Sequence, residues 1–254
     1  MIGRARLVSI LTPLIGVVCF LFIWYFAVAV RLVDPVLLPT PNVVLANVWS
    51  GLTGGKIGSD LLKTIQRVFM AIALASCIGI PTGVLLGASE RLYRSLEFVI
   101  DFFRSTPTSA VFPLFLVIFG VDDRTKVYIG TFGATLAIIF NSAYGVMNAR
   151  KTRVLAARIM GASRLHILLV VLLESLPQTF IGLRTGVSIS LVSVIVAEMF
   201  FGSKDGIGQR VFESVQLFDM PQMYAAIFCS GILGYGLNLS LSLTERRFVH
   251  WSGR

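Results

Sequence analysis

Six ionisable residues lie inside or beside long apolar runs of this 254-residue chain, where a charge is costly and usually faces protein or water. They are Glu97, Asp101, Arg104, Glu174, Arg184 and Glu198. The first three are spaced four and three residues apart, so they share one helix face. Two interpretations of this face remain open. Asp101 and Arg104 neutralise each other, or Arg104 lines a path that attracts an anion, together with its hydroxyl neighbours Ser105, Thr106, Thr108 and Ser109.

Glu198 follows Arg184 at a distance of about 21 Å along a helix that rises 1.5 Å per residue, so the two side chains cannot pair directly. We expect Glu198 near the external end of its helix, either in an external gate or docking surface or simply at the membrane interface. The serine hydroxyls between Arg184 and Glu198 could bind a ligand, or they could allow close helix packing. The candidate pathway or gate residues are Arg104, Ser105, Thr106, Thr108, Ser190, Ser193 and Glu198.

The sequence lacks the motifs that nucleotide binding and metal catalysis need. Gly58, Lys63 and Thr64 resemble the ends of a phosphate-binding loop, but Leu62 stands where the second glycine is required. His166 and His250 are the only histidines, and neither belongs to an H-E-x-x-H set. We therefore expect no catalytic residue, metal site or cofactor in this chain. Any ATP and magnesium would be bound by a partner.

The apolar runs decide the class of protein. The chain is 56% hydrophobic and 14% charged with a mean hydropathy of +0.83, whereas a soluble domain is about one quarter charged. A spanning helix needs about 20 apolar residues. Runs without Asp, Glu, Lys or Arg cover 7–30, 68–89, 105–121, 127–149, 185–197 and 222–244. The third and fifth are short and must extend through Asp101, Arg104 or Arg184. We predict an all-α polytopic membrane protein with six transmembrane helices.

The distribution of basic residues indicates the orientation. With a cytoplasmic amino terminus, the internal segments contain Arg4, Arg6, Arg91, Arg94, Arg150, Lys151, Arg153, Arg158, Arg164, Arg246, Arg247 and Arg254. The external segments contain half as many, namely Arg31, Lys56, Arg124, Lys126, Lys204 and Arg210. Both termini are therefore expected in the cytoplasm. Topology then explains the net charge of +9, and no nucleic-acid partner is needed.

Small residues four apart predict which helices pack closely, because helices in lipid gain little from the hydrophobic effect when they associate. The second, fourth, fifth and sixth spans carry such ridges, for example Gly79, Gly83 and Gly87. The first span has only Gly16, which indicates a peripheral helix, so spans two to six would form a five-helix core. Proline should kink or interrupt the second span at Pro81 and the third at Pro107 and Pro113.

Four regions follow from these patterns. Residues 1–30 form the peripheral first helix, and 31–62 form an external connector with a short helix that starts at Thr40 and Pro41. Residues 63–245 form the core, and 246–254 are a basic cytoplasmic tail. Within the core, 149–166 is a long cytoplasmic connection in which Gly161 and Ser163 should break a basic amphipathic helix. This helix rests on anionic lipid or docks into a soluble partner.

The cytoplasmic connection resembles the coupling segment of membrane subunits from ABC-type importers. The resemblance rests on Ala156-Ala157, Gly161-Ala162-Ser163, the leucine-rich run to Pro177 and Ile181-Gly182-Leu183-Arg184. Further similar stretches are Leu37-Leu38-Pro39-Thr40-Pro41, Phe103-Arg104-Ser105-Thr106-Pro107, Val196-Ala197-Glu198-Met199, Gly206-Ile207-Gly208 and 243–251. Together they cover nearly the whole chain and resemble the permeases of the nitrate, sulfonate, taurine and bicarbonate importer group.

The resemblance implies a type I importer permease fold and a role without chemistry of its own. The chain would form the translocation pathway for a small anionic solute in the bacterial inner membrane. Its implied partners are a cytoplasmic ABC ATPase dimer, a second permease chain and an external solute-binding protein. The implied ATPase-coupling residues are Leu155, Ala156, Ala157, Arg158, Gly161, Ala162 and Ser163.

Two residues depart from the family pattern. Leu155 stands where the pattern has an acidic residue, and Glu174 stands where it usually has a first proline. Ionic contact with the ATPase would then be weaker or rearranged. Either a second, non-identical permease keeps the acidic residue, or the ATPase has changed to match.

Two other function classes are alternatives. A stand-alone secondary transporter or channel would usually contain inverted repeats or paired broken helices, and the sequence has no such internal symmetry. A membrane scaffold without transport would leave the cytoplasmic connection without a docked ATPase.

Overall fold

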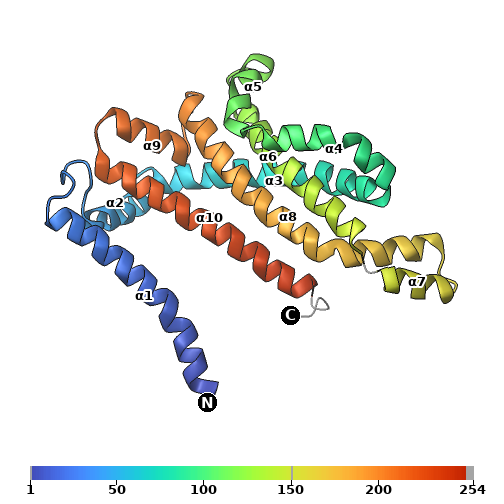
Figure 1. Cartoon of the computed structure of the whole chain (residues 1–254). Coiled ribbons are helices and arrows are strands. Elements are labelled where there is room, and N and C mark those ends of the chain that lie inside the picture. The colour runs from blue at the N-terminus through green and yellow to red at the C-terminus, as the bar shows by residue number, and fades with distance from the viewer. Residues whose placement is uncertain (1, 150, 250–254) are drawn as a thin grey trace.

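The computed structural model describes residues 2–149 and 151–249, with side chains described from Ile15 onward except those of 150 and 151. The described residues form helices and connecting loops, as expected for an all-α protein (Figure 1). The elements are α1 (Ile2–Ala29), α2 (Pro41–Thr53), α3 (Ile57–Ala88), α4 (Glu90–Ser105), the 3-10 turn η1 (Thr108–Val111), α5 (Phe112–Phe119), α6 (Asp123–Met147), α7 (Lys151–Ile159), α8 (Arg164–Phe200), α9 (Ile207–Gln216) and α10 (Met220–Phe248).

Four of the described helices, α3, α6, α8 and α10, are long and apolar enough to cross a membrane. A fifth crossing is present if α4 and the segment Thr108–Phe119 count as one broken span, bent by 90°. The difference from the six expected spans lies in α1, whose described apolar part, Ile15–Ala29, is shorter than the other spans.

Proline acts differently in the two helices where a kink or an interruption was expected. The third span is interrupted at Pro107, which separates α4 from η1, and Pro113 lies in the first turn of α5. Helix α3 instead continues through Pro81 to Ala88. The expected extension of the fifth span is confirmed, because α8 runs unbroken through Arg184.

Helices α3, α6 and α8 form the tightly packed centre of the chain, with α6 in contact with both others. A methyl group added to Gly83 of α3 would lie 2.7 Å from the carbonyl oxygen of Ile139 in α6. One added to Gly145 of α6 would lie 2.9 Å from the carbonyl oxygen of Ser175 in α8. Such distances leave no room for a side chain. The small-residue ridges therefore bring backbones together, as predicted for these three helices.

The other members of the expected five-helix core are packed less tightly. Helix α4 buries none of its residues, and little of the apolar stretch of α10 is buried. Large apolar side chains such as Phe98 and Phe102 point outward from α4. Within one chain, α4 and α10 therefore flank a three-helix centre, and their outer faces are suited to contact with lipid or with another protein.

Helices α1 and α2 lie at the edge of the molecule (Figure 1). The described side chains of α1, from Ile15 onward, are mostly exposed, and Trp24 attaches the helix by donating from Nε1 to the carbonyl oxygen of Pro39 at 3.1 Å. Helix α2 begins at Pro41 with Thr40 as its N-cap residue, as expected from the sequence. It packs against α10 and α3 and buries Val44, so the connector helix rests on other spans.

The connection between α6 and α8 is a helical hairpin at one end of the bundle (Figure 1). Helix α7 ends at Ile159, and the chain turns at Gly161, whose φ of +77° favours glycine. Ser163 then caps α8, because its Oγ accepts from the backbone N–H of His166 at 3.4 Å. The expected break at Gly161 and Ser163 is therefore present. The carboxyl end of α10 lies near this end of the bundle, whereas α2 and α9 lie at the opposite end.

The packing of α3 against α6 generates a first prediction. The substitution Gly83→Val should force the two backbones apart and lower the free energy of unfolding by about 1–3 kcal/mol or more. The matched control is Gly231→Val on α10, since nothing lies within 4 Å of a Cβ built there. Thermal unfolding of the detergent-purified chain measures the difference. Equal stability of the two variants would contradict the close contact of α3 and α6.

Candidate functional site

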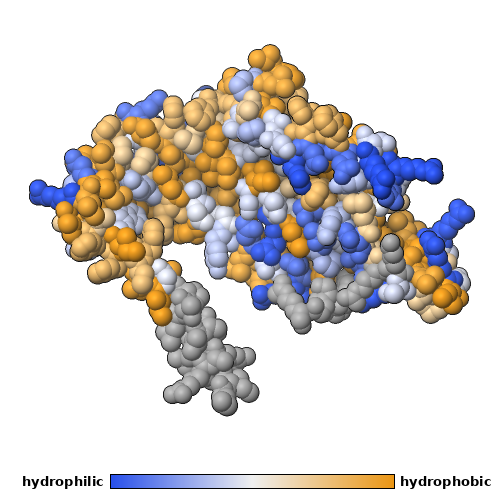
Figure 2. All heavy atoms as spheres, in the orientation of Figure 1, coloured by the Kyte–Doolittle hydropathy of each residue, from blue (hydrophilic) through white to orange (hydrophobic). Residues whose placement is uncertain are grey.

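A groove lined by both polar and apolar side chains runs along α8 between α4, α6 and α10, and we call it the α8 groove. It consists of three adjoining cavities of about 390, 450 and 450 Å³. The first two share Thr108 and Ile189, and Thr185 and Ser188 join them to the third. Its polar lining comprises Arg104, Thr106, Thr108, Ser109, Asn141, Arg184, Thr185, Ser188, Ser193 and Asn238. Figure 2 shows hydrophilic residues over α4 and the middle of the molecule, whereas hydrophobic residues cover the regions of α1, α2 and α5.

The break between α4 and η1 places Arg104 at the first cavity. Its guanidinium lies 3.5 Å from the carboxylate of Asp101 and 4.4 Å from the ring centroid of Phe140. Both sequence-based interpretations of Arg104 therefore describe part of its surroundings, since it pairs with Asp101 and also lines the groove. Thr106 lines the same cavity, while Ser105 is exposed at the end of α4 outside the lining. Irregular backbone inside a membrane span is tolerated where it borders protein or a polar cavity, as here.

The three candidate residues in the carboxyl-terminal half of α8 have different surroundings. Ser190 is completely buried against α6, where a Cβ on Gly130 would lie 2.8 Å from its Oγ, so it serves packing. Ser193 is also buried but borders the second cavity of the groove. Glu198 has 0% exposure and takes no part in the groove lining.

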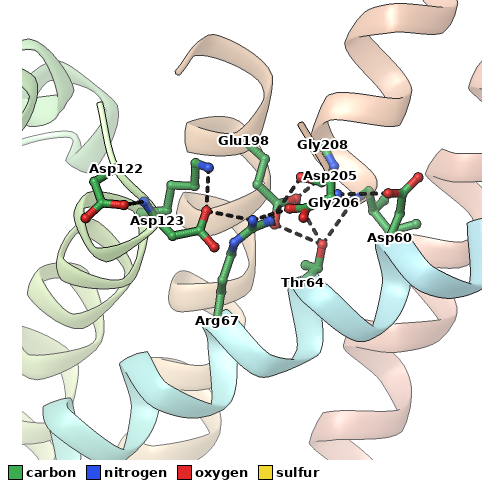
Figure 3. A network of polar contacts seen from close by, with 11 residues as sticks. Asp60, Thr64, Arg67, Asp122, Asp123, Glu198, Asp205, Gly206 and Gly208 are labelled. Atoms are coloured by element: carbon green, nitrogen blue, oxygen red, sulfur yellow. Dashed lines mark hydrogen bonds and ion pairs between the residues drawn. The ribbon is translucent and has the colours of Figure 1, made fainter. Parts of the chain in front are cut away.

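Glu198 belongs to a partly buried ionic network (Figure 3), which lies at the end of the bundle opposite α7 (Figure 1). At its centre, Arg67 of α3 pairs with Glu198 of α8 at 2.7 Å, Asp123 of α6 at 2.7 Å, and the carboxylate of Asp205 in the loop after α8. Arg67 also donates to the carbonyl oxygen of Asp205 at 3.1 Å. We call Arg67 and these three carboxylates the Arg67 hub. It joins α3, α6, α8 and the following loop at one point.

Hydrogen bonds occupy the remaining positions around the buried carboxylate of Glu198. Thr64, one turn before Arg67, donates to the carboxylate at 2.9 and 3.0 Å. The backbone N–H of Gly208 donates to Oε2 at 2.9 Å, and that of Ile207 donates to the Thr64 oxygen at 3.0 Å. A buried charge is tolerated when it is paired and hydrogen-bonded in this way.

Two glycines allow the loop to approach Glu198. A Cβ on Gly206, whose φ is +111°, would lie 2.5 Å from the carboxyl carbon of Glu198. A Cβ on Gly208 would lie 2.0 Å from the carbonyl oxygen of Ile195 in α8. The Gly206-Ile207-Gly208 stretch is therefore explained by close backbone contact with α8.

A second ion pair extends the network toward α9. Asp60 of α3 accepts from the backbone N–H of Gly206 at 3.1 Å and pairs with Arg210 of α9 at 2.7 Å. On the α6 side, Lys126 pairs with Asp123 at 2.8 Å. The network thus spans from the start of α6 across α3 to α9.

Sequence reasoning identified Glu198 but missed the residues that hold it. Asp60, Thr64 and Arg67 are spaced four and three residues apart, the same helical spacing that singled out Glu97, Asp101 and Arg104. This spacing was the available signal. Two features of the sequence hide this signal. Lys63 and Thr64 resemble the end of a phosphate-binding loop, and the charge-free apolar run begins only at Val68.

The hairpin tip formed by the end of α7 and the following turn exposes apolar side chains. Leu155, Ile159 and Met160 are 58%, 78% and 79% exposed. Ala157 is buried, and Arg153 of α7 pairs with Glu174 of α8, so α7 is fixed to the start of α8. The other expected coupling residues lie exposed or half-buried around this tip, namely Ala156, Arg158, Gly161, Ala162 and Ser163.

The Arg67 hub generates the second prediction. The substitution Arg67→Met leaves the carboxylate of Glu198 buried beside an apolar chain, and breaking a buried pair in this way costs about 3–5 kcal/mol. We expect a large fall in the thermal stability of the purified chain, partly recovered in the double variant with Glu198→Gln. Arg124→Met, an exposed arginine at the start of α6, is the matched control. A double variant no more stable than Arg67→Met would show that the pairing is not the source of the loss.

Similarity to known proteins extends over most of this chain. Residues 79–250 match the family described as the binding-protein-dependent transport system inner membrane component. A probable ABC transporter permease of Brucella abortus (strain 2308) is 30% identical over 233 residues, which cover 91% of each chain. The nitrate import permease of Synechococcus elongatus is 31% identical over 94% of this chain and 88% of its own. The taurine transport system permease of Escherichia coli is 26% identical over 92% of this chain and 86% of its own.

The fold is also similar to that of a solved transporter. One chain of the inward-facing MetNI methionine ABC transporter superposes with a TM-score of 0.65 at 21% sequence identity, covering 75% of this chain and 94% of that chain. This similarity shows the type I ABC importer permease fold. Together with the family match, the α8 groove and the helical hairpin, it establishes that this chain, a multi-pass membrane protein, belongs to the family of binding-protein-dependent transport system inner membrane components, the permease subunits of ABC importers.

Proposed function

We propose that this chain and a second permease chain, identical or related, form the translocation pathway of an ATP-driven importer for a small oxyanion. The complex would lie in the bacterial inner membrane, with both termini of this chain in the cytoplasm. A cytoplasmic ABC ATPase dimer would bind ATP and magnesium, and an external binding protein would deliver the solute. Family membership favours this function over the alternative of a stand-alone transporter or channel.

The observation that carries the proposal is the hairpin tip. An apolar patch of Leu155, Ile159 and Met160 lies next to the exposed basic residues Arg158 and Arg164. Apolar side chains exposed together at a polar rim are typical of a protein-binding site. Because Arg153 and Glu174 fix α7 to α8, a partner that moves the tip also moves α8. Helix α8 borders the groove along its length and ends at the Arg67 hub.

The structure of the hairpin shows the surroundings of both residues that depart from the family pattern. Glu174 stands where a proline is usual, and here its carboxylate binds α7 within the chain. Leu155 stands where an acidic residue is usual, and here it is part of the apolar patch. In the proposed complex, apolar contact replaces an ionic contact with the ATPase, and the ion pair acts inside the hairpin instead.

The composition of the groove supports an anionic solute. Arg104 and Arg184 contribute its charged lining, and hydroxyl and amide groups contribute most of its remaining polar surface. Relatives of this chain are named for the transport of taurine, nitrate and aliphatic sulfonates, all of which are small ions with oxygen-bearing anionic groups. The exposed outer faces of α4 and α10 support a second permease chain, because such faces could close the open side of the groove.

Docking of the ATPase is tested at the hairpin tip. The variant Ile159→Asp with Met160→Asp places two charges in the apolar patch and should abolish copurification of the ATPase and solute uptake, while leaving membrane insertion intact. The control is Leu217→Asp, which changes an equally exposed apolar residue at the opposite end of the bundle. Normal ATPase copurification with the double-aspartate variant would overturn the docking role of the tip.

The hairpin ion pair generates a further prediction. Arg153→Glu places like charges together and should loosen α7, so that ATP turnover continues while uptake per ATP falls several-fold. The exchanged double variant, Arg153→Glu with Glu174→Arg, should recover most of the uptake. The matched control is Arg94→Glu beside Glu90 in α4, a fully solvated pair for which a cost below about 1 kcal/mol is expected. No recovery in the exchanged variant would contradict the role of this pair in transmitting movement.

A further inference from the structure

We propose that Arg184 forms a second anion-binding subsite in the α8 groove, next to the cavity of Arg104 and one helical turn closer to the hairpin. This inference rests on the proposed function, because it names a resting point for the solute inside the proposed pathway. The ligand is a small oxyanion with a nitrate or sulfonate group. The subsite is the third cavity of the groove, of about 450 Å³.

Five residues from two helices line this subsite. Ile181, Arg184, Thr185 and Ser188 come from α8, and Asn238 comes from α10. Thr185 also borders the cavity of Arg104. The cavities of the two arginines therefore adjoin at Thr185, so an anion could pass from one arginine to the other within the groove.

The guanidinium of Arg184 is loosely held compared with that of Arg67. Its nearest carboxylate oxygen, Oε2 of Glu245 in α10, lies 3.6 Å away, beyond ordinary hydrogen-bond distance. Among the described residues, this buried oxygen has no hydrogen-bond partner, and none accepts a hydrogen bond from the Arg184 side chain. The corresponding contacts of Arg67 with Glu198 and Asp123 are both 2.7 Å. Arg184 therefore keeps N–H donors for a ligand.

The other polar groups of the subsite are already engaged. Ser188 donates to the carbonyl oxygen of Arg184 at 3.3 Å and accepts from Asn238 at 3.0 Å. Thr185 donates to the carbonyl oxygen of Ile181 at 3.0 Å. These bonds orient the lining but leave the guanidinium as the main source of free donors. Its planar fork can bind two oxygens of one oxyanion, which a lysine ammonium cannot match in geometry.

Glu245 determines how firmly the subsite holds its ligand. Its negative charge beside Arg184 reduces the attraction for an anion without removing it. Weak holding suits a pathway, because a solute must leave a site as readily as it enters. Removing this charge should therefore make binding tighter.

The test uses the complete transporter, with its ATPase and binding protein, reconstituted in proteoliposomes. Nitrate, taurine and ethanesulfonate are the probes for uptake, and their direct binding to the purified transporter without binding protein is measured by calorimetry. Arg184→Gln should lower uptake and binding of the transported anion roughly tenfold or more, with ATPase copurification unchanged. Arg184→Lys should retain more of both. Glu245→Gln should bind the anion more tightly than the wild type, and Arg94→Gln on exposed α4 is the control.

The outcomes separate this inference from the proposed function. Wild-type uptake and binding in Arg184→Gln would overturn the subsite and leave the importer function standing. A wild-type transporter that takes up none of the three anions would overturn the proposed solute class and the subsite with it. Unchanged binding in Glu245→Gln would overturn the weakening role of Glu245.

Discussion

The close approach of α6 to both α3 and α8 is the constraint on which the rest of the structure depends. Glycines at the contacts, such as Gly83 and Gly145, let one backbone lie against another, so the three helices behave as one rigid layer. The Arg67 hub then ties the ends of the same three helices together. Because this layer is fixed, the groove has one firm wall, formed by α6 and α8. The less tightly packed α4 and α10 form its sides.

Helix α8 connects the three functional regions of the chain. It begins at Arg164, directly after the hairpin tip, borders all three cavities of the groove, and ends within a few residues of Glu198. Pro177 lies inside it without ending it. A movement applied at α7 therefore reaches the groove through a single continuous element. The ion pair of Arg153 and Glu174 lies at the point where that movement enters α8.

Much of this arrangement could be predicted from the sequence, because periodicity and charge distribution are local properties. The apolar runs predicted the long helices, Pro107 predicted the broken span, and Gly161 with Ser163 predicted the turn before α8. The Arg67 hub could not be predicted in the same way. Its three carboxylates lie 56 to 138 residues from Arg67 in sequence, and only packing decides that Arg67 meets Glu198 and Asp205. The role of Ser190 was likewise open until its burial against Gly130 was known.

The carboxylates around Arg67 differ in their access to water. Glu198 is sealed from solvent, whereas the side chains of Asp205 and Asp123 are 39% and 54% exposed. Dissolved ions screen exposed charges far more than buried ones. The ion pair between α3 and α8 is thus shielded from dissolved ions, whereas the pairs of Arg67 with Asp123 and Asp205 are open to them. At this end of the protein, the salt concentration of the medium therefore acts on the pairs to α6 and to the loop and leaves the pair that joins α3 to α8 unscreened.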